Sequence, residues 1–310
     1  MKILLTGAGS FTGYWFASAL QKAGHHVLAP LRGKVESYDG VRLQRASLLS
    51  SHAQLIEDCA FGGERFLEIM REGIDVLCHH AAQVMGYKSP DFDVGGALIN
   101  NTLNLRSVLN LGKESGLKAV VLTGSVFEAD EGAGSRPLRA FSPYGLSKGL
   151  TAEVFRFWCG ELGIPLAKFV IPNPFGLWEE ERFCAYLMRC WTKNEVASVI
   201  TPSYVRDNIH VSLLALAYAD VVDRAKGLHV FSRFCPSGYA ESQGAFSRRF
   251  AEEIGGRLGL VAKLKLCRQT EFIEPPVRIN TDIPNIDRLS WDEGHAWDEL
   301  ADYYQTKYLV

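Results

Sequence analysis

A glycine-rich turn near the N-terminus lies between a short apolar run and a helical pattern. The run Lys2-Ile-Leu-Leu5 precedes the turn Thr6-Gly-Ala-Gly-Ser-Phe-Thr-Gly13, and residues 24–29 are predicted to form a second strand. Between turn and strand, apolar side chains recur at helical spacing, namely Trp15, Phe16, Ala19, Leu20 and Ala23. Because strands joined by a helical crossover pair in parallel, we expect a parallel sheet covered by helices.

The composition of this turn suits a bound phosphate. Gly7 permits a tight turn, the backbone near Gly9 is open to a pyrophosphate, and Gly13 lets the helix pack close to the strand. The phosphates would lie at the positive end of the helix dipole. An ordinary α/β turn is the alternative. We predict that a dinucleotide cofactor binds Gly7, Gly9, Ser10, Phe11, Thr12 and Gly13.

The end of the second strand bears on the kind of dinucleotide. It reads Ala29-Pro-Leu31-Arg32 and lacks the acidic residue that binds the ribose hydroxyls of NAD. Arg32 is suited instead to pair with a 2′-phosphate. The sequence therefore favours NADP as the cofactor, with NAD possible.

Strand and helix signals alternate along the following residues. Buried strands are predicted at 73–82, 118–122 and 163–171, with helices at 98–111 and from Tyr144 onward. This order predicts an α/β fold built on a doubly wound parallel (Rossmann) sheet.

Two segments depart from the alternation and indicate a second part of the molecule. A helix at 211–220 and a strand at 228–231 return to the sheet pattern. We therefore predict an NADP-binding domain at 1–172, to which 206–234 returns. Residues 173–205 and 235–310 are predicted to form a smaller C-terminal lobe.

The composition excludes several classes of protein. The 310 residues carry a net charge of −2 with no run of Lys or Arg, so a nucleic-acid partner is not expected. The apolar runs are too short for a signal peptide or membrane span. The seven cysteines are irregularly spaced, which indicates reduced thiols in a cytoplasmic protein. His79 and His80 would point to opposite faces of a strand, so no metal site is expected.

The stretch Ser142-Pro-Tyr-Gly-Leu-Ser-Lys148 has the spacing of an acid–base pair. Ser142 is a good N-cap and Pro143 fits the first helical position, so a helix should begin just before Tyr144. Four residues separate Tyr144 from Lys148, which places both on one helix face. The ammonium and the helix dipole both favour the phenolate. The alternative is a surface helix with an ordinary tyrosine and lysine.

These motifs together resemble those of the extended short-chain dehydrogenases/reductases, a group of nucleotide-sugar epimerases, dehydratases and reductases. The turn at 6–13 resembles the family's TGxxGxxG loop, with Ser10 where the middle glycine is usual, and Tyr144-x-x-x-Lys148 matches the catalytic pair. The other matches follow in the family's order: an HxAA strand end at 79–82, Thr123-Gly-Ser125, an N-x-(Y/F)-G segment within 172–176 and an R-D-x-(I/V)-H-V segment at 206–211.

The resemblance implies roles for the catalytic residues. Tyr144 would exchange a proton with the reacting oxygen, and Lys148 would hold the nicotinamide ribose and lower the pKa of the phenol. A second hydroxyl would hydrogen-bond the reacting oxygen. Alignment of the family motif on the strand at 120–122 makes this hydroxyl Ser125, which we prefer, whereas alignment on Val126 and Phe127 makes it Thr123. Thr123 would support the same oxygen or the cofactor.

The resemblance implies that the smaller C-terminal lobe is a substrate-binding lobe, and it implies further binding residues. Beyond the glycine loop and the catalytic groups, those expected to line the cofactor are Leu48, His80, Ala81, Ala82, Asn101, Pro172 and Asn173. Those expected to bind the substrate are Gln83, Asn173, Arg182, Arg206 and Arg278. Arg206 and Arg278 are the candidates for a substrate diphosphate, which an arginine fork suits.

The residues after Ser125 narrow the expected reaction. Dehydratases of this family carry Asp-Glu directly after the hydroxyl, whereas Val126 and Phe127 follow here. Glu128, Asp130 and Glu131 are expected in a solvated loop. We therefore expect an NADP-dependent reductase of a 4-keto nucleotide sugar. The alternatives are a nucleotide-sugar epimerase that retains NAD(P), a reductase of a non-sugar carbonyl, and a non-catalytic dinucleotide-sensing protein.

The resemblance extends to assembly. Family members pair through two helices per subunit, here near 97–112 and 144–160, so a homodimer is expected.

Overall fold

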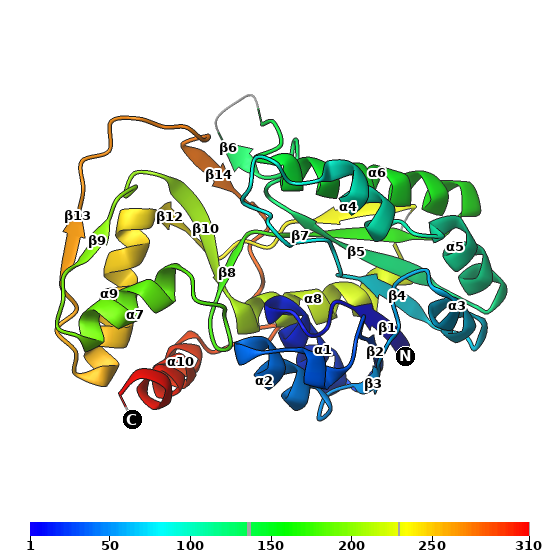
Figure 1. Ribbon diagram of the computed structural model, residues 1–310, viewed down its shortest axis with the longest axis horizontal. Helices are drawn as coiled ribbons and strands as arrows, with labels where there is room; N and C mark the ends of the chain where they lie inside the picture. The colour runs from blue at the N-terminus through cyan, green and yellow to red at the C-terminus, as the bar shows by residue number, and fades with distance from the viewer. Residues whose placement is uncertain (135–137, 229, 310) are drawn as a thin grey trace. The chain divides into compact units, whose positions relative to one another are not determined.

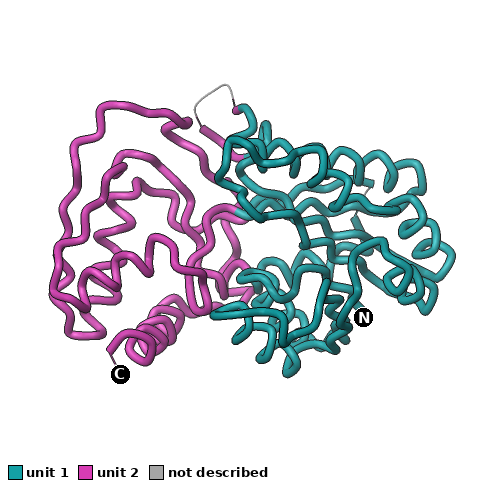
Figure 2. The backbone as a smooth tube through the Cα atoms, viewed as in Figure 1, with its two compact units in different colours: residues 1–131, 139–171, 215–235 teal, residues 132–138, 172–214, 236–310 magenta. Residues whose placement is uncertain are grey.

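The computed structural model describes residues 1–134, 138–228 and 230–309. The chain forms two compact units (Figure 2). Unit 1 comprises residues 1–131, 139–171 and 215–235, and unit 2 comprises 132–138, 172–214 and 236–310.

Unit 1 is built on a seven-stranded sheet in the order β11-β7-β5-β4-β1-β2-β3 (Figure 1). Every pairing in it is parallel. Its strands are β1 (Lys2–Thr6), β2 (His26–Pro30), β3 (Gln54–Ile56), β4 (Val76–His79), β5 (Ala119–Ser125), β7 (Leu166–Ile171) and β11 (Phe231–Phe234). This confirms the predicted doubly wound sheet.

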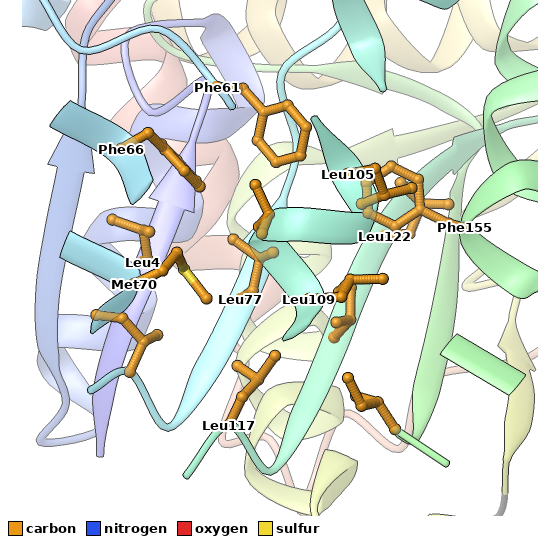
Figure 3. Close-up of a cluster of buried hydrophobic side chains, with 14 of the residues drawn as sticks. Leu4, Phe61, Phe66, Met70, Leu77, Leu105, Leu109, Leu117, Leu122 and Phe155 are labelled. Carbon is orange, nitrogen blue, oxygen red and sulfur yellow. The ribbon is translucent and has the colours of Figure 1, made fainter. Parts of the chain in front are cut away.

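Helices cover both faces of this sheet. They are α1 (Phe11–Lys22), α2 (Gly40–Leu49), α3 (Glu64–Arg71), α4 (Val94–Asn101), α5 (Leu105–Glu114), α6 (Pro143–Leu162) and most of α8 (Val211–Ala225), with a short 3₁₀ helix at Val35–Ser37. One core packs α3, α5 and α6 onto the strands through residues such as Met70, Leu77 and Phe155 (Figure 3). On the other face, Phe16 of α1 stacks on Tyr218 of α8, 3.9 Å between ring centroids. Burial on both faces explains the continuous apolar runs of the strands.

Two expected elements differ in the structure. The single helix predicted at 98–111 is wrong, because α4 and α5 are separated at residues 102–104. Asn104 has a left-handed backbone (φ +51°), and its Nδ2 donates to the carbonyl oxygen of Gly62 at 2.9 Å. This long-range bond holds Asn104 outside the helical conformation, so the helix is interrupted there. The returning strand β11 begins at Phe231, where the prediction had it end.

Unit 2 contains a mixed five-stranded sheet. It follows the order β12-β10-β14-β6, and β8 also pairs with β10. The strands are β6 (Ala133–Gly134), β8 (Asn173–Phe175), β10 (Val205–His210), β12 (Tyr239–Ser242) and β14 (Val277–Ile279); β9 (Ala197–Val199) and β13 (Leu264–Leu266) form a separate pair. The predicted domains assigned residues 206–214 to the dinucleotide domain, whereas they lie in unit 2 because β10 pairs with β8, β12 and β14.

The helices of unit 2 enclose an aromatic core. They are α7 (Phe183–Thr192), α9 (Gln243–Leu258) and α10 (Glu293–Tyr308). Phe175, Trp191, Phe250 and Trp297 are buried between them. All four of these residues belong to unit 2.

Within the described residues, no helix is both long and apolar enough to cross a membrane. The same residues hold no cluster of three or more His, Cys, Asp or Glu arranged to bind a metal ion. All seven cysteines lie in the described part of the chain as free thiols.

Candidate functional site

The glycine-rich turn connects β1 directly to α1. Gly7 has φ +73°, and a Cβ there would lie 2.8 Å from the backbone nitrogen of Ala81. A Cβ on Gly13 would lie 2.2 Å from the carbonyl oxygen of Gly7. At Gly9 the nearest atom to such a Cβ is Leu31 Cδ2 at 3.9 Å, so the loop is open there. Ser10 is the N-cap of α1 and accepts from the Gly13 N–H at 3.1 Å, which gives its departure from glycine a structural role.

His80 connects this turn to the end of β5. Its Nε2 lies 3.0 Å from the hydroxyl oxygens of both Ser10 and Thr12, and its Nδ1 lies 3.0 Å from Thr123 Oγ1. Burial, followed by the charge of Lys148, lowers the pKa of His80 to about 3, so the ring is neutral at physiological pH. A neutral imidazole both donates and accepts, which suits a set of hydroxyl partners.

His79 faces the other way, as predicted for adjacent strand residues. Its Nδ1 lies 3.2 Å from Thr6 Oγ1, and its ring stacks on Phe155 with centroids 4.9 Å apart. The same Thr6 hydroxyl accepts from the backbone N–H groups of His80 and Ala81. His79 is therefore a packed core residue that helps hold the end of β4 against β1.

Helix α6 begins as the sequence predicts. Ser142 Oγ accepts from the Gly145 N–H at 3.2 Å, and Pro143 is the first helical residue. The Tyr144 ring makes edge contacts with Tyr87 and Phe92, at centroid distances of 5.7 and 5.9 Å. Tyr144 is thus held in an aromatic setting one turn before Lys148.

Lys148 is buried, with 5% of its surface exposed. Its Nζ donates to the carbonyl oxygen of Thr123 at 2.5 Å. Burial lowers the pKa of Lys148 to about 8, opposed by the carboxylate of Glu128 and assisted by the charge of Lys168. The side chain is therefore still mostly an ammonium at pH 7, hydrogen-bonded beside the strand end that carries both candidate hydroxyls.

Thr123 and Ser125 point to one face of β5 with Gly124 between them. Thr123 is 3% exposed and is engaged by His80. Ser125 is half-buried, and its Oγ accepts from the Phe127 N–H at 3.2 Å. Because Phe127 is the donor in that bond, the Ser125 hydroxyl keeps its own proton for donation.

The prediction of a solvated loop after Ser125 is wrong for two of its three acids. Glu128 and Glu131 are 0% and 4% exposed, whereas Asp130 is exposed. Lys168 Nζ lies 2.6 Å from Glu128 Oε2 and 2.7 Å from Glu131 Oε1. Lys168, which projects from β7, pairs with both carboxylates, and these ion pairs offset part of the cost of burying them.

Two arginines differ in how well the sequence predicts them: Arg32 was singled out, whereas Arg45 was not. Arg32 follows β2 and is exposed. Arg45 on α2 is 1% exposed, and its Nε donates to the carbonyl oxygen of Gly9 at 3.3 Å. No motif marks Arg45; only the fold brings α2 to the glycine loop. Leu48, also on α2, is 39% exposed.

Asn101, at the end of α4, is hydrogen-bonded both to Gln83 and to α6. Asn101 Oδ1 accepts from the Gln83 N–H at 2.9 Å, and its Nδ2 donates to Thr151 Oγ1 at 3.2 Å. The buried Asn101 amide therefore fixes the segment that follows Ala81 and Ala82.

The remaining candidates lie in unit 2. Arg206 on β10 is paired in register with Arg278 on β14. Arg206 Nη2 lies 3.0 Å from Glu274 Oε2, and its Nη1 donates to carbonyl oxygens of Val205, Pro275 and Pro276. Arg278 is 1% exposed.

The N-terminal part of unit 2 holds three more predicted residues. Asn173 is exposed and its Nδ2 donates to Asn208 Oδ1 at 2.8 Å, next to the buried Pro172. Arg182 is exposed, with its Nη2 3.8 Å from Glu180 Oε2. Neither contact by itself indicates a bound ligand.

Comparisons with solved structures show the same fold. UDP-glucuronic acid 4-epimerase from Bacillus cereus aligns over 99% of this chain and 100% of that chain, with a TM-score of 0.72 and 18% identity. UDP-glucose 4-epimerase from Thermotoga maritima aligns over 99% of each chain, with a TM-score of 0.69 and 17% identity. The UDP-Glc/GlcNAc 4-epimerase from Campylobacter jejuni aligns over 98% of this chain and 99% of that one, with a TM-score of 0.70 and 18% identity.

A comparison with curated protein sequences found no significant match. A family model described as the NAD dependent epimerase/dehydratase family matches residues 3–231. That range contains the glycine-rich turn, both strand ends and helix α6 with Tyr144 and Lys148. The chain therefore belongs to the NAD dependent epimerase/dehydratase family, the enzymes of the extended short-chain dehydrogenase/reductase type.

Proposed function

We propose that the protein is a nucleotide-sugar epimerase that retains its nicotinamide cofactor through the reaction. The observation that carries this proposal is the arrangement of Tyr144 and the buried Lys148 on α6, with Lys148 bonded to the strand end that bears Ser125. Val126 and Phe127 replace the dehydratase acid and base, which argues against elimination. The similar solved structures named above are 4-epimerases, so this alternative is better supported than the 4-ketoreductase that the sequence alone favoured.

The glycine-rich turn fits the pyrophosphate of a dinucleotide. The open space at Gly9 and the N-terminus of α1 offer backbone N–H groups to an anion. Lys148 would hold the nicotinamide ribose, and the strand ends at Ala81, Ala82 and Thr123 would border the ring. When bound, the nicotinamide supplies hydride acceptance and return.

The residues of this chain then move the proton. Tyr144 takes the proton from a sugar hydroxyl as that carbon is oxidised, and it returns the proton when the ketone is reduced from the other face. Ser125 donates a hydrogen bond to the same oxygen and stabilises its developing charge. Lys148 favours the ionised tyrosine by its positive charge. One set of groups therefore serves both half-reactions.

We further propose that the cofactor is NADP. It is supported by Arg32 after β2 and by the absence of an acid at that strand end. Bound NAD is named for the similar enzyme from Bacillus cereus, and NAD remains the second candidate.

For the substrate, we propose a nucleotide sugar whose diphosphate is bound by Arg206. A guanidinium that already binds a carboxylate, that of Glu274, has the geometry to bind a phosphate. Arg278, Asn173, Arg182 and Gln83 are further proposed contacts. UDP-sugars are the first substrates to test, because the similar enzymes named above act on them.

We further propose a cytoplasmic homodimer. The cytoplasm is supported by seven free thiols. The dimer is supported by exposed apolar side chains on α4 and α6, which pack side by side in unit 1: Ile99, Leu146, Leu150 and Phe157. The solution mass measured by light scattering tests it.

The decisive assay distinguishes an epimerase from the three alternative functions. The protein is incubated with UDP-glucose or UDP-glucuronic acid and a trace of NAD(P), and the products are separated chromatographically. An epimerase forms the epimer without net consumption of cofactor. A reductase leaves these sugars unchanged but consumes NADPH with a 4-keto sugar or a non-sugar carbonyl. Cofactor binding without any turnover would support a non-catalytic dinucleotide-sensing protein and contradict the proposal.

A further inference from the structure

A buried ionic cluster lies behind the strand end that carries Ser125. Its buried members are Glu128, Glu131 and Lys168, and the exposed Arg233 contacts it from the surface; all four residues belong to unit 1. Lys168 bridges the two carboxylates, and Arg233 Nη1 lies 3.5 Å from Glu131 Oε2. The chemistry proposed above uses none of the four. Charges this deeply buried cost free energy, which raises the question of what the cluster does.

Glu128 closes a tight turn around Ser125. The Glu128 N–H donates to the Ser125 carbonyl oxygen at 3.0 Å. In the other direction, the Ser125 N–H donates to Glu128 Oε1 at 2.7 Å. Both backbone polar groups of Ser125 are thus bonded to one residue. The Ser125 hydroxyl is in turn fixed by the Phe127 N–H, so its direction depends on this turn.

Lys168 fixes Glu128 from the neighbouring strand. Burial alone lowers the pKa of Lys168, but the carboxylates of Glu128 and Glu131 outweigh it, so the pKa is raised and the side chain stays charged. Gly124 makes this approach possible, because a Cβ there would lie 2.8 Å from Lys168 Cε. The glycine between the two candidate hydroxyls therefore leaves room for the lysine beneath the strand.

The same turn contacts the start of α6. The Phe127 carbonyl oxygen accepts from the Phe141 N–H at 2.7 Å. A Cβ on Gly145 would lie 2.0 Å from that oxygen. The Phe127 ring meets the Tyr144 ring edge-on at 6.5 Å. A turn held by Glu128 therefore sets the spacing between Ser125 and the helix that carries Tyr144.

We propose that Glu128, held in place by Lys168, is a positioning residue. It directs the Ser125 hydroxyl toward the reacting oxygen and sets its position relative to Tyr144. The proposal rests on the proposed function for its kinetic consequence. Its structural core is that the Glu128 carboxylate oxygen, as acceptor of the Ser125 N–H, fixes the turn at residues 125–128.

The test compares variants that keep or remove this acceptor. Glu128→Gln keeps an oxygen for the Ser125 N–H, whereas Glu128→Leu has a similar size and no acceptor. Amide hydrogen exchange at residues 125–127 should stay slow in Glu128→Gln and accelerate in Glu128→Leu, with unchanged NAD(P) affinity. The turnover number should fall about 10- to 100-fold in Glu128→Leu only, the scale of a misplaced group. Asp130→Asn, an exposed acid of the same loop, is the matched control and should change nothing.

A double-mutant cycle with Ser125→Ala shows whether Glu128 acts through Ser125. The loss in turnover from Glu128→Leu should largely disappear when Ser125 is already alanine, because no Ser125 hydroxyl is then left for Glu128 to position. Additive losses, or unchanged exchange in Glu128→Leu, would overturn the proposal.

If Glu128→Leu fails to fold, variants of Lys168 test the proposal instead. Lys168→Met should accelerate exchange at residues 125–127 and lower turnover, and Lys168→Met/Glu128→Gln should recover both. Failure of that recovery would count against the proposal. If the wild-type chain turns over no nucleotide sugar, the proposed function fails, and the exchange rates alone decide the positioning.

Discussion

The ammonium of Lys148 donates to the carbonyl oxygen of Thr123 across 2.5 Å, which joins α6 to the end of β5. The lysine that is proposed to hold the cofactor ribose is therefore also a structural link to the candidate hydroxyls. Thr123 Oγ1 lies 3.0 Å from His80, and His80 reaches Ser10 and Thr12 of the glycine-rich turn. Two different atoms of Thr123, its carbonyl oxygen and its Oγ1, thus connect Lys148 with His80 and the glycine-rich turn.

Tyr144→Phe should remove the proton-exchanging group and leave the fold intact. The phenyl ring keeps the edge contacts to Tyr87 and Phe92. We expect turnover to fall by about 10²- to 10⁴-fold, the usual contribution of a positioned acid–base group. NAD(P) affinity and the melting temperature should stay close to wild type. A variant with normal turnover would remove Tyr144 from the mechanism.

Lys148→Met should stabilise the protein at neutral pH. The folded-state pKa is lowered from 10.5 to about 8, so the folded state disfavours the ammonium. This penalty is fully present below pH 8 and is relieved as pH rises from 8 to 10.5. It amounts to at most about 3 kcal/mol at neutral pH, by the conversion of pKa units to free energy. Loss of the bond to Thr123 offsets about 1 kcal/mol.

The measurement for Lys148 is the unfolding free energy of both proteins at several pH values. The variant should be more stable at pH 7, and its advantage should vanish near pH 10.5. A variant that is less stable at pH 7, with the same difference at every pH, would contradict the assigned cost of the buried charge.

Two glycines of α6 should respond oppositely to alanine. At Gly145 the new Cβ would lie 2.0 Å from the Phe127 carbonyl oxygen, whereas at Gly160 no atom lies within 4 Å. Gly145→Ala should destabilise by about 1–3 kcal/mol, as overpacking does, and disturb the turn at Ser125. Gly160→Ala should stabilise by roughly 0.5–1 kcal/mol through helix propensity. Denaturant unfolding checks both; equal effects would argue against the close packing of α6 on this turn.

Arg32→Ala should weaken NADP binding more than NAD binding. Arg32 is exposed, so its loss removes a charge–phosphate contact without a packing defect. We expect roughly a tenfold rise in the NADP dissociation constant, the size of one charge-assisted hydrogen bond. Lys34→Ala, another exposed cation of the same loop, is the control. Calorimetric titration with each dinucleotide gives the answer, and equal changes for NAD and NADP would remove Arg32 as the discriminating residue.

The parts of the structure that depend on local signals were predictable. The strand–turn–helix order, the parallel sheet and the Ser142 cap of α6 all follow from residues close in sequence. The separation of α4 from α5 was not, because it depends on the left-handed Asn104 and its bond to Gly62, 42 positions away.

The least predictable features pair residues that are distant in the chain. Glu128 and Glu131 read as loop acids in the sequence, and only the pairing of β5 with β7 brings Lys168 to them. Arg45 carries no motif and reaches the glycine-rich turn only through the packing of α2 on α1. Ser10 departs from the family's glycine, and its cap of α1 together with its contact to His80 was visible only in the fold.

The central claim is that one bound cofactor takes a hydride from the sugar and returns it to the same carbon. The most direct measurement uses a UDP-sugar carrying deuterium at C4, with excess unlabelled NAD(P)H in the medium and mass-spectrometric analysis of the epimer. Retention of deuterium at C4 of the epimer is the predicted result. Protium at C4 of the epimer would contradict the account, and recovery of the labelled sugar without any epimer would favour a reductase.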